Sequence, residues 1–220
     1  MFETDVTERE TRVFVQARMS SRRFPGKVLA PFAGRPLIDH VLEQVAKALP
    51  RKRIVVATST EPSDDPLVAY LRECGVKICR GPLDDVFGRF QECLNTHPSA
   101  WFYRVCADSP VLDPRLFGWL QERSGADVDL VTNVCPRSFP KGQSLELVNS
   151  DTFRTISGAH LSAEQREHVT QVFYDNPSRF RIVNVVSYDA RLSRTSVAVD
   201  TLDEFRALEQ AHVDRACRTL

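Results

Sequence analysis

Four cationic side chains follow the first apolar run of the chain within ten residues. The run is Arg12–Ala17, and the cations are Arg18, Arg22, Arg23 and Lys27. Cations this close repel one another unless an anion lies among them, and a guanidinium group binds phosphate oxygens through two parallel hydrogen bonds. A bound triphosphate would supply that anion. On charge alone, a solvated basic loop is the better explanation, because basic runs are common.

Two aspartates each follow a short apolar run. Asp108 lies just beyond Trp101–Val105, and Asp200 directly follows Val197–Val199. Carboxylates at such positions can hold Mg²⁺, which takes one or two carboxylates together with phosphate oxygens. Either aspartate taken singly is weak evidence, since Asp also forms turns and caps helices.

A parallel sheet would bring the basic loop and Asp108 to one place. Apolar runs alternate with segments of helical period over residues 12–131, which predicts a mostly parallel sheet covered by helices on both faces. In such sheets, ligands bind beyond the carboxyl ends of the strands. The expected strands are Arg12–Ala17, Arg53–Ala57, Val76–Cys79, Trp101–Val105 and Val128–Val131, and the expected helices are Leu37–Leu49, Asp65–Cys74, Asp84–Leu94 and Pro114–Arg123.

The alternation changes after Cys135. Ser144–Val148 alternates as a half-buried antiparallel strand does, and Ala163–Tyr174 has helical spacing. We expect residues 136–188 to form an excursion from the main sheet that serves dimerisation or acceptor binding. The remaining expected elements are the strands Arg181–Val186 and Val197–Val199 and the helix Thr201–Ala216, and the aromatic residues of the excursion are Phe139, Phe153, Phe173 and Tyr174.

Composition narrows the class of protein. The chain has 220 residues, enough for one α/β domain, and its 29 basic and 29 acidic side chains cancel. A neutral chain has no broad attraction for nucleic acid or an anionic membrane. No apolar run reaches the length of a membrane span, and the six cysteines lack metal-binding spacing. We expect a single cytoplasmic domain over residues 12–220 behind a flexible tail, residues 1–11.

A series of segments resembles the cytidylyltransferases that make CMP-linked acidic sugars. Val15–Leu29 (VQARMSSRRFPGKVL) is similar to the signature of the spore-coat polysaccharide (SpsF-type) branch, usually close to QARMGSTRLPGKVL. CMP-3-deoxy-manno-octulosonate synthetase and CMP-sialic acid synthetase are relatives of this branch. Segments in the same order over nearly the whole chain make the resemblance specific. The others are Ala33–His40, Val56–Pro66, Arg80–Phe90, Arg104–Pro114, Arg166–Thr170 and Val199–Phe205.

The resemblance implies a fold and a reaction. The fold is the three-layer, Rossmann-like nucleotidyltransferase fold of nucleotide-diphospho-sugar transferases. The reaction moves CMP from CTP to an acidic sugar or related anionic acceptor and releases pyrophosphate, with Mg²⁺ as cofactor and a homodimer as the assembly. Two alternatives stay open: a nucleotide-sugar-dependent glycosyltransferase, and a catalytically weakened nucleotide-binding homologue.

The resemblance also implies roles for individual residues. The basic loop wraps the triphosphate, with Arg18 and Lys27 taking part in catalysis. Asp108 and Asp200 hold the metal and are catalytic as well. The implied nucleotide contacts are Gln16, Ala17, Arg18, Arg23, Lys27 and Arg80, and the implied acceptor contacts are Lys141, Gln143, Glu146 and His168.

Four residues depart from the family pattern. Ser20 and Ala107 replace glycines, and a side chain at Ser20 restricts the backbone where the loop should approach phosphate. Lys141 and Ser144 replace aspartates beside the expected acceptor site. The loss of negative charge there indicates either an acceptor more anionic than usual or drift away from catalysis.

Overall fold

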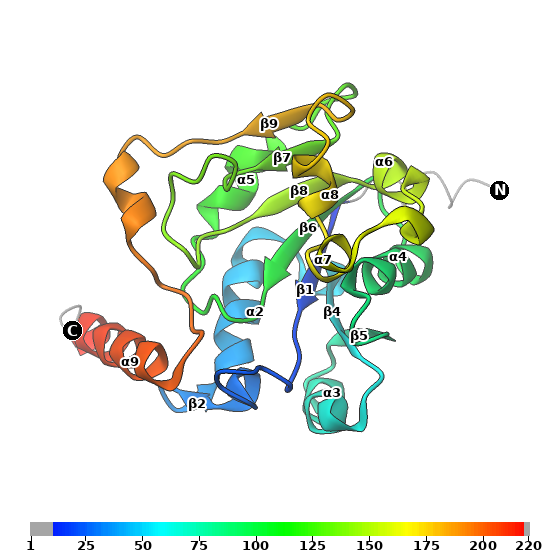
Figure 1. Ribbon diagram of the computed structural model, residues 1–220. Helices are drawn as coiled ribbons and strands as arrows, with labels where there is room; N and C mark the ends of the chain where they lie inside the picture. Colours follow the sequence, from blue (N-terminus) through cyan, green and yellow to red (C-terminus); the bar gives the residue numbers. More distant parts are fainter. Residues whose placement is uncertain (1–10, 218–220) are drawn as a thin grey trace.

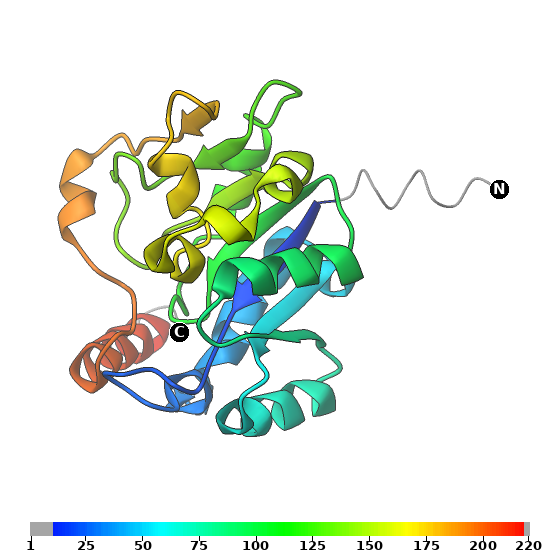
Figure 2. The ribbon, with the colours of Figure 1, turned by 45° about the vertical axis from the view of Figure 1, so that its right-hand side comes forward.

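One seven-stranded sheet lies between two layers of helices. The computed structural model describes residues 11–217 (Figure 1). In the turned view of Figure 2, α4 and α7 lie in front of the sheet and α2 behind it. This arrangement matches the predicted three-layer α/β fold. In spatial order the strands are β5 (Lys77–Gly81), β4 (Ile54–Ser59), β1 (Thr11–Gln16), β6 (Trp101–Cys106), β8 (Glu146–Asn149), β7 (Leu130–Thr132) and β9 (Ile182–Asn184).

Helices cover both faces of the sheet. One face carries α2 (Leu37–Ala48), α3 (Asp65–Glu73), α5 (Arg115–Gln121) and α9 (Leu202–Cys217), and the other carries α4 (Val86–Thr96), α6 (Ser150–Thr155), α7 (Ala163–Glu167) and α8 (Gln171–Tyr174). The shorter elements are β2 (Pro31–Phe32), β3 (Arg35–Pro36), η1 (Lys27–Leu29), η2 (Arg51–Arg53), η3 (Pro62–Asp64), η4 (Gly158–His160) and η5 (Ala190–Arg194).

The central strand β1 faces a hydrophobic core on each side. Val13 and Val15 are buried in the core under α2. Phe14 points the other way and stacks on Phe102 at a centroid distance of 5.1 Å, with Phe90 of α4 at 5.9 Å. A strand covered on both faces needs apolar residues at every position, which is why β1 reads as a continuous apolar run.

The parallel strands end at the same edge of the sheet. β1 pairs in parallel with β4 and with β6, and Gln16 is in register with Ala57 and Cys106. The basic loop (residues 18–27) and the loop after β6 therefore leave the sheet side by side. The expectation that Asp108 and the basic loop share one edge is confirmed.

Residues 136–188, which the sequence predicts to leave the main sheet, contribute two of its strands, β8 and β9. β8 runs antiparallel between β6 and β7, and β9 pairs in parallel with β7. The antiparallel strand itself is confirmed. The chain returns to the sheet at β8, where Leu147 and Val148 are each buried in one of the two cores. A role of residues 136–188 in dimerisation or acceptor binding stays a prediction.

The predicted helix Ala163–Tyr174 is two short helices. A capping box formed by Ser162 and Gln165 starts α7, and the backbone of His168 (φ −107°, ψ 87°) ends it before α8 begins. The break turns Thr170 inward, where its hydroxyl donates to the buried carboxylate of Glu146 at 2.6 Å. Helical spacing in the sequence does not reveal a tertiary hydrogen bond of this kind.

The predicted strand Val197–Val199 is an extended segment outside the sheet. Its backbone bonds to two loops instead, with Val197 N–H donating to Lys141 O at 2.7 Å and Val199 N–H to Asp108 O at 2.8 Å. The segment therefore ties the loop after β6 to the stretch that holds Lys141.

The predicted tail, residues 1–11, lies outside the described residues except for Thr11, the first residue of β1. Among residues 11–217, none of the helices has the length and apolar character needed to cross a membrane.

Candidate active site

A cavity of about 370 Å³ opens at the carboxyl ends of β1 and β6. Its walls come from the basic loop, the loop after β6, the end of α7 and the residue that precedes α9. Most of the residues predicted for nucleotide and metal binding meet there. The predicted site residues in its lining are Gln16, Ala17, Arg18, Arg23, Lys27, Asp108, His168 and Asp200.

Lys27 lies between the two predicted metal aspartates. Its side chain is 10% exposed, and Nζ donates to Val199 O at 2.6 Å. The same Nζ lies 3.5 Å from Asp108 Oδ2 and 3.6 Å from Asp200 Oδ1. Gly26, with φ 75°, makes the left-handed turn that starts η1 and directs Lys27 inward. Two carboxylates that face one ammonium are close enough to share one cation.

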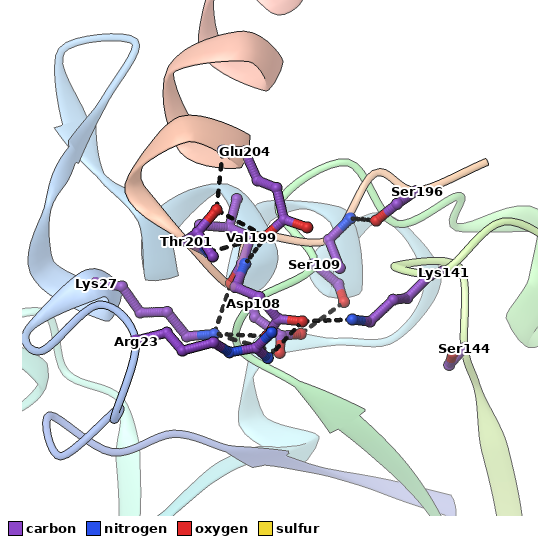
Figure 3. Close-up of polar contacts among 12 residues, drawn as sticks. Arg23, Lys27, Asp108, Ser109, Lys141, Ser144, Ser196, Val199, Thr201 and Glu204 are labelled. Carbon is purple, nitrogen blue, oxygen red and sulfur yellow. Dashed lines mark hydrogen bonds and ion pairs between the residues drawn. The ribbon is translucent and has the colours of Figure 1, made fainter.

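Asp200 carries two further cations. Arg23 Nη2 lies 2.9 Å from its Oδ2, and Lys141 Nζ donates to the same oxygen. Figure 3 shows these basic side chains converging beside Asp108. Burial alone would raise the pKa of the Asp200 carboxyl, but the hydrogen bond and charge of Lys141, with the charges of Lys27 and Arg23, outweigh it and lower that pKa. Asp200 is therefore held as a carboxylate.

Glu204, in the first turn of α9, accepts hydrogen bonds from the backbone N–H groups around Asp200. Glu204 Oε2 accepts from the N–H groups of Asp200 and Thr201, each at 2.9 Å, and Thr201 Oγ1 accepts from Glu204 N–H at 3.2 Å. A carboxylate is favoured at a helix N-terminus. Thr201 and Glu204 thus cap the helix together, and the Asp200 side chain, which is not used as a cap, lines the cavity.

The two aspartates suit a divalent cation that also binds substrate oxygens. Within residues 11–217, no group of three or more His, Cys, Asp or Glu side chains could hold a metal without further ligands. Mg²⁺ commonly takes one or two carboxylates and completes its shell with phosphate oxygens and water. Asp108, 28% exposed and hydrogen-bonded through Oδ1 to Ser109 at 3.0 Å, presents its other oxygen toward Lys27. The donor set fits Mg²⁺ that arrives with a nucleotide.

Arg104 lines the cavity and was missed by the sequence reasoning. Its Nη2 donates to Gln16 Oε1 at 3.2 Å, and its Nη1 donates to Glu146 Oε2 at 2.6 Å. The available signal was an arginine inside the otherwise apolar strand β6 (WFYRVC). Glu167, whose carboxylate lies 3.4 Å from the Arg18 guanidinium, is a second lining residue that was not predicted, although it belongs to the family-like segment Arg166–Thr170.

Glu146 lies behind the cavity, not in its lining. It is 3% exposed, and its Oε1 accepts from the hydroxyls of Thr170 and Tyr174, each at 2.6 Å. Burial alone would raise the pKa of the Glu146 carboxyl, but the charge of Arg104 and these hydrogen bonds lower it. Burial and the Glu146 charge raise the pKa of Tyr174. Glu146 thus fixes Arg104, while a direct contact with the acceptor stays a prediction.

Arg80 and Gln143 also lie outside the cavity lining. Arg80 donates to Ser59 O at 2.8 Å and pairs with Asp65 at 2.8 Å. Gln143 accepts from Asp113 N–H at 2.7 Å and donates to Val111 O at 2.8 Å. Both side chains brace loops that border the site.

A buried carboxylate anchors the start of the basic loop. Asp64 is fully buried, and its Oδ1 accepts from Met19 N–H at 2.7 Å. Its Oδ2 accepts from Thr58 Oγ1 and Ser59 N–H, each at 3.0 Å, and from Ser59 Oγ. Burial alone would raise the pKa of Asp64, but these hydrogen bonds lower it. The sequence reasoning did not identify Asp64.

Ser20 and Ala107, which replace glycines of the family pattern, introduce no backbone strain. Among the described residues, Ala33 (φ 47°) is the one non-glycine with positive φ, so Ser20 and Ala107 adopt backbone angles open to any residue. The Ser20 hydroxyl is buried without a hydrogen-bond partner. Nothing in the backbone at these two positions therefore indicates lost activity.

Known proteins share this fold and these motifs. Residues 13–217 match the family model described as Cytidylyltransferase. The chain is 28% identical over 204 residues to the spore coat polysaccharide biosynthesis protein SpsF of Bacillus subtilis (strain 168). The matched region covers 89% of this chain and 83% of that protein. A cytidylyltransferase from Leptospira borgpetersenii serovar Hardjo-bovis superposes with a TM-score of 0.86 at 22% identity, covering 92% and 86% of the two chains. CMP:2-keto-3-deoxy-manno-octonic acid synthetase in complex with CTP gives a TM-score of 0.69 at 18% identity, with 94% and 99% covered.

Proposed function

The chain belongs to the cytidylyltransferase family, and on that premise we propose that it transfers CMP from CTP to an acidic sugar or a related anionic acceptor, releasing pyrophosphate. The observation that carries the proposal is the meeting of Lys27, Asp108 and Asp200 at one cavity beside the basic loop. Family membership leaves the glycosyltransferase alternative without support. The absence of backbone strain at Ser20 and Ala107 argues against the weakened-homologue alternative.

Asp108 and Asp200 are the residues that would hold Mg²⁺. When bound, the ion would offset charge on the α-phosphate and orient the acceptor oxygen for in-line attack. Lys27 lies within 3.6 Å of both carboxylates and donates to the Val199 carbonyl, so its charge is held beside the residues that would bind the metal. The chain's contribution is positioning and electrostatic stabilisation, as in phosphoryl transfer generally.

The basic loop would neutralise the triphosphate. Arg18, Arg22 and Arg23 line the cavity together with Lys27. Arg23 is 61% exposed and its partner in this state is Asp200, so it can turn to a phosphate when a nucleotide enters. As pyrophosphate leaves, its growing negative charge would be balanced by these side chains.

Gln16 would contact the cytosine base. Its Oε1 accepts from Arg104, so its NH₂ group is left to donate to an acceptor edge such as O2 or N3 of cytosine. Ala17, the next residue, lines the same wall. Arg80 as a base contact stays a prediction, because its guanidinium is engaged by Ser59 O and Asp65.

The acceptor would approach from the side of His168 and Glu167, which line the cavity beside Arg18. Lys141 is 52% exposed and can meet an acceptor carboxylate from the other side of Asp200. We place the reaction in the cytoplasm, where CTP is available and where buried reduced thiols such as Cys79 and Cys93 persist.

The proposal is tested by pyrophosphate release from CTP, UTP, ATP and GTP across a panel of acceptors. The panel holds a 3-deoxy-octulosonate, a nonulosonic acid and a neutral hexose as control. We expect CTP with an acidic sugar to be the productive pair, because a site that hydrogen-bonds one base strongly rejects another lacking its groups. Equal turnover of all four nucleotides, or turnover with the neutral hexose alone, would contradict the proposal.

A further inference from the structure

Lys141 binds a carboxylate oxygen of Asp200, one of the two predicted metal ligands. Its ammonium donates to Asp200 Oδ2, which also pairs with Arg23, whereas Lys27 contacts Oδ1. We propose that Lys141 competes with the divalent cation for Asp200, so that metal binding displaces Lys141 and delivers its ammonium to the acceptor. This inference rests on the proposed function, because it requires a metal between Asp108 and Asp200.

The backbone holds Lys141 next to Asp200. Lys141 N–H donates to Thr195 O at 3.0 Å, and Lys141 O accepts from Val197 N–H at 2.7 Å. Gly142 then turns with φ 91°, and a Cβ there would lie 2.6 Å from Ala198 N. A loop held this closely against residues 195–198 presents the Lys141 side chain to Asp200 as a fixed feature of the fold.

Lys141 is one of two exposed cations on Asp200 Oδ2 that can leave, and Arg23 is the other. Its side chain is 52% exposed, and Asp200 is the partner of its ammonium among the described contacts. Lys27 is 10% exposed and also donates to Val199 O, so it would lose a buried hydrogen bond on leaving. An exposed ammonium regains water at little cost, whereas a buried one does not.

The positive charge around the two aspartates favours a divalent cation that replaces Lys141 over one that binds in addition to it. Arg23, Lys27 and Lys141 already surround Asp108 and Asp200. A divalent cation added to this cluster would repel three positive side chains at short range. Exchange of Lys141 for the metal lowers that repulsion. It leaves Arg23 as the remaining cation on Oδ2, and Arg23 can turn to a phosphate of the nucleotide.

Release of Lys141 would couple metal binding to acceptor binding. Lys141 and Ser144 come from neighbouring parts of one loop (Figure 3), and the freed ammonium would be available there to pair with an acceptor carboxylate. An acceptor that holds Lys141 away from Asp200 would in turn strengthen metal binding, because coupling between two sites is reciprocal. Removal of Lys141 should therefore tighten metal binding and weaken acceptor binding, two opposite changes that a merely structural role would not produce.

The test measures Mn²⁺ binding to the full chain by electron paramagnetic resonance, without nucleotide, in the wild type and in Lys141→Met. We expect about tenfold tighter binding in the variant, the factor that applies if Lys141 holds Asp200 in about nine-tenths of molecules. Arg137→Met is the matched control. It removes the same charge from the same loop, but Arg137 donates to Ser144 Oγ and not to Asp200.

A second readout follows the ammonium directly. Mg²⁺ should raise the rate of reductive methylation of Lys141, measured by mass spectrometry, and leave the exposed Lys77 at the far end of β5 unchanged. For each productive acceptor, Lys141→Met should also raise KM with the melting temperature preserved. Unchanged Mn²⁺ affinity in Lys141→Met, equal tightening in Arg137→Met, or no Mn²⁺ binding to either protein would each overturn the inference.

These outcomes separate the inference from the proposed function. Mn²⁺ binding is read without turnover, so pyrophosphate release with an unchanged Mn²⁺ affinity in Lys141→Met would contradict the inference alone. Tighter Mn²⁺ binding in a protein that releases no pyrophosphate from any nucleotide would instead contradict the proposed function.

Discussion

At the scale of single residues, the two aspartates have different surroundings. Asp200 is 12% exposed and is contacted by Arg23, Lys27 and Lys141. Asp108 is 28% exposed and is contacted by Lys27 and Ser109. Asp108 is therefore the better position for a substitution that removes a metal ligand and leaves the packing intact.

Asp108→Asn keeps the size of the side chain and removes its charge. We expect kcat for pyrophosphate release to fall by about 10²–10³-fold, the loss seen when one group that stabilises transition-state charge is removed. The melting temperature should stay close to that of the wild type, because the side chain is partly exposed and makes few contacts. Near-normal turnover with Mg²⁺ would show that Asp108 is not a metal ligand.

Glu146→Gln tests whether Glu146 supports Arg104 or meets the acceptor. Loss of the carboxylate leaves a buried guanidinium unpaired, and removal of one partner of such a pair costs about 3–5 kcal/mol of unfolding free energy. Tyr174→Phe is the milder comparison, since it removes one hydrogen bond to Glu146 at a cost of about 1 kcal/mol. Urea unfolding measures both. A raised acceptor KM with unchanged stability in Glu146→Gln would instead identify Glu146 as an acceptor contact.

At the scale of elements, the strongly patterned parts of the chain were predictable and the tertiary contacts were not. The apolar runs of β1, β4 and β6 indicate buried parallel strands, and their carboxyl ends locate the basic loop and Asp108. The break between α7 and α8 was missed because Thr170 turns inward to a partner 24 residues away. Asp64 was missed for the same reason, since it binds Met19 across 45 residues. Sequence spacing does not show such pairings.

The hydrogen bond from Met19 of the basic loop to Asp64 of η3 should make the free energy of unfolding depend on pH. Asp64→Asn removes an ionised acceptor from several buried donors, and we expect it to lower the free energy of unfolding by about 1–3 kcal/mol at pH 7. The folded state lowers the pKa of Asp64, so this stabilisation is complete above the unfolded value of about 3.9 and is lost as pH falls through the lower folded value.

The difference between the wild type and Asp64→Asn should therefore shrink as pH falls below about 4. Urea unfolding at a series of pH values measures it. Asp65→Asn is the control, because the neighbouring Asp65 is 60% exposed and its pairing with Arg80 lies at the surface. A gap that is independent of pH, or an equal loss in Asp65→Asn, would show that the Asp64 carboxylate does not anchor the loop.

At the scale of the whole molecule, the exposed apolar residues of segment 136–188 differ from the aromatic residues that the sequence suggested for self-association. Phe153 and Phe173, two of the aromatic residues expected to pair, are fully buried in the core. Val186 is 64% exposed and Tyr188 is 99% exposed, just beyond the edge strand β9. We still expect a homodimer, and we now expect its apolar contacts to come from Val186 and Tyr188 at this edge of the sheet.

We expect a homodimer at micromolar concentration by light scattering coupled to size-exclusion chromatography. A double change of Val186→Asp and Tyr188→Asp should shift the protein to a monomer, since charges on an exposed edge prevent pairing. Lys77→Asp, at the opposite edge strand, should not. A monomeric wild type, or a dimer unaffected by the double change, would exclude this interface.

The contact between Lys27 and Val199 joins residues 172 positions apart. Closure of so long a loop is entropically costly unless the intervening sheet has already brought its ends together. The ammonium and the carboxylates therefore meet only when residues 195–200 dock, after the strands before them have paired. During refolding from urea, secondary structure should return before pyrophosphate release does. On the ribosome, likewise, the site cannot form until residues 195–200 have emerged.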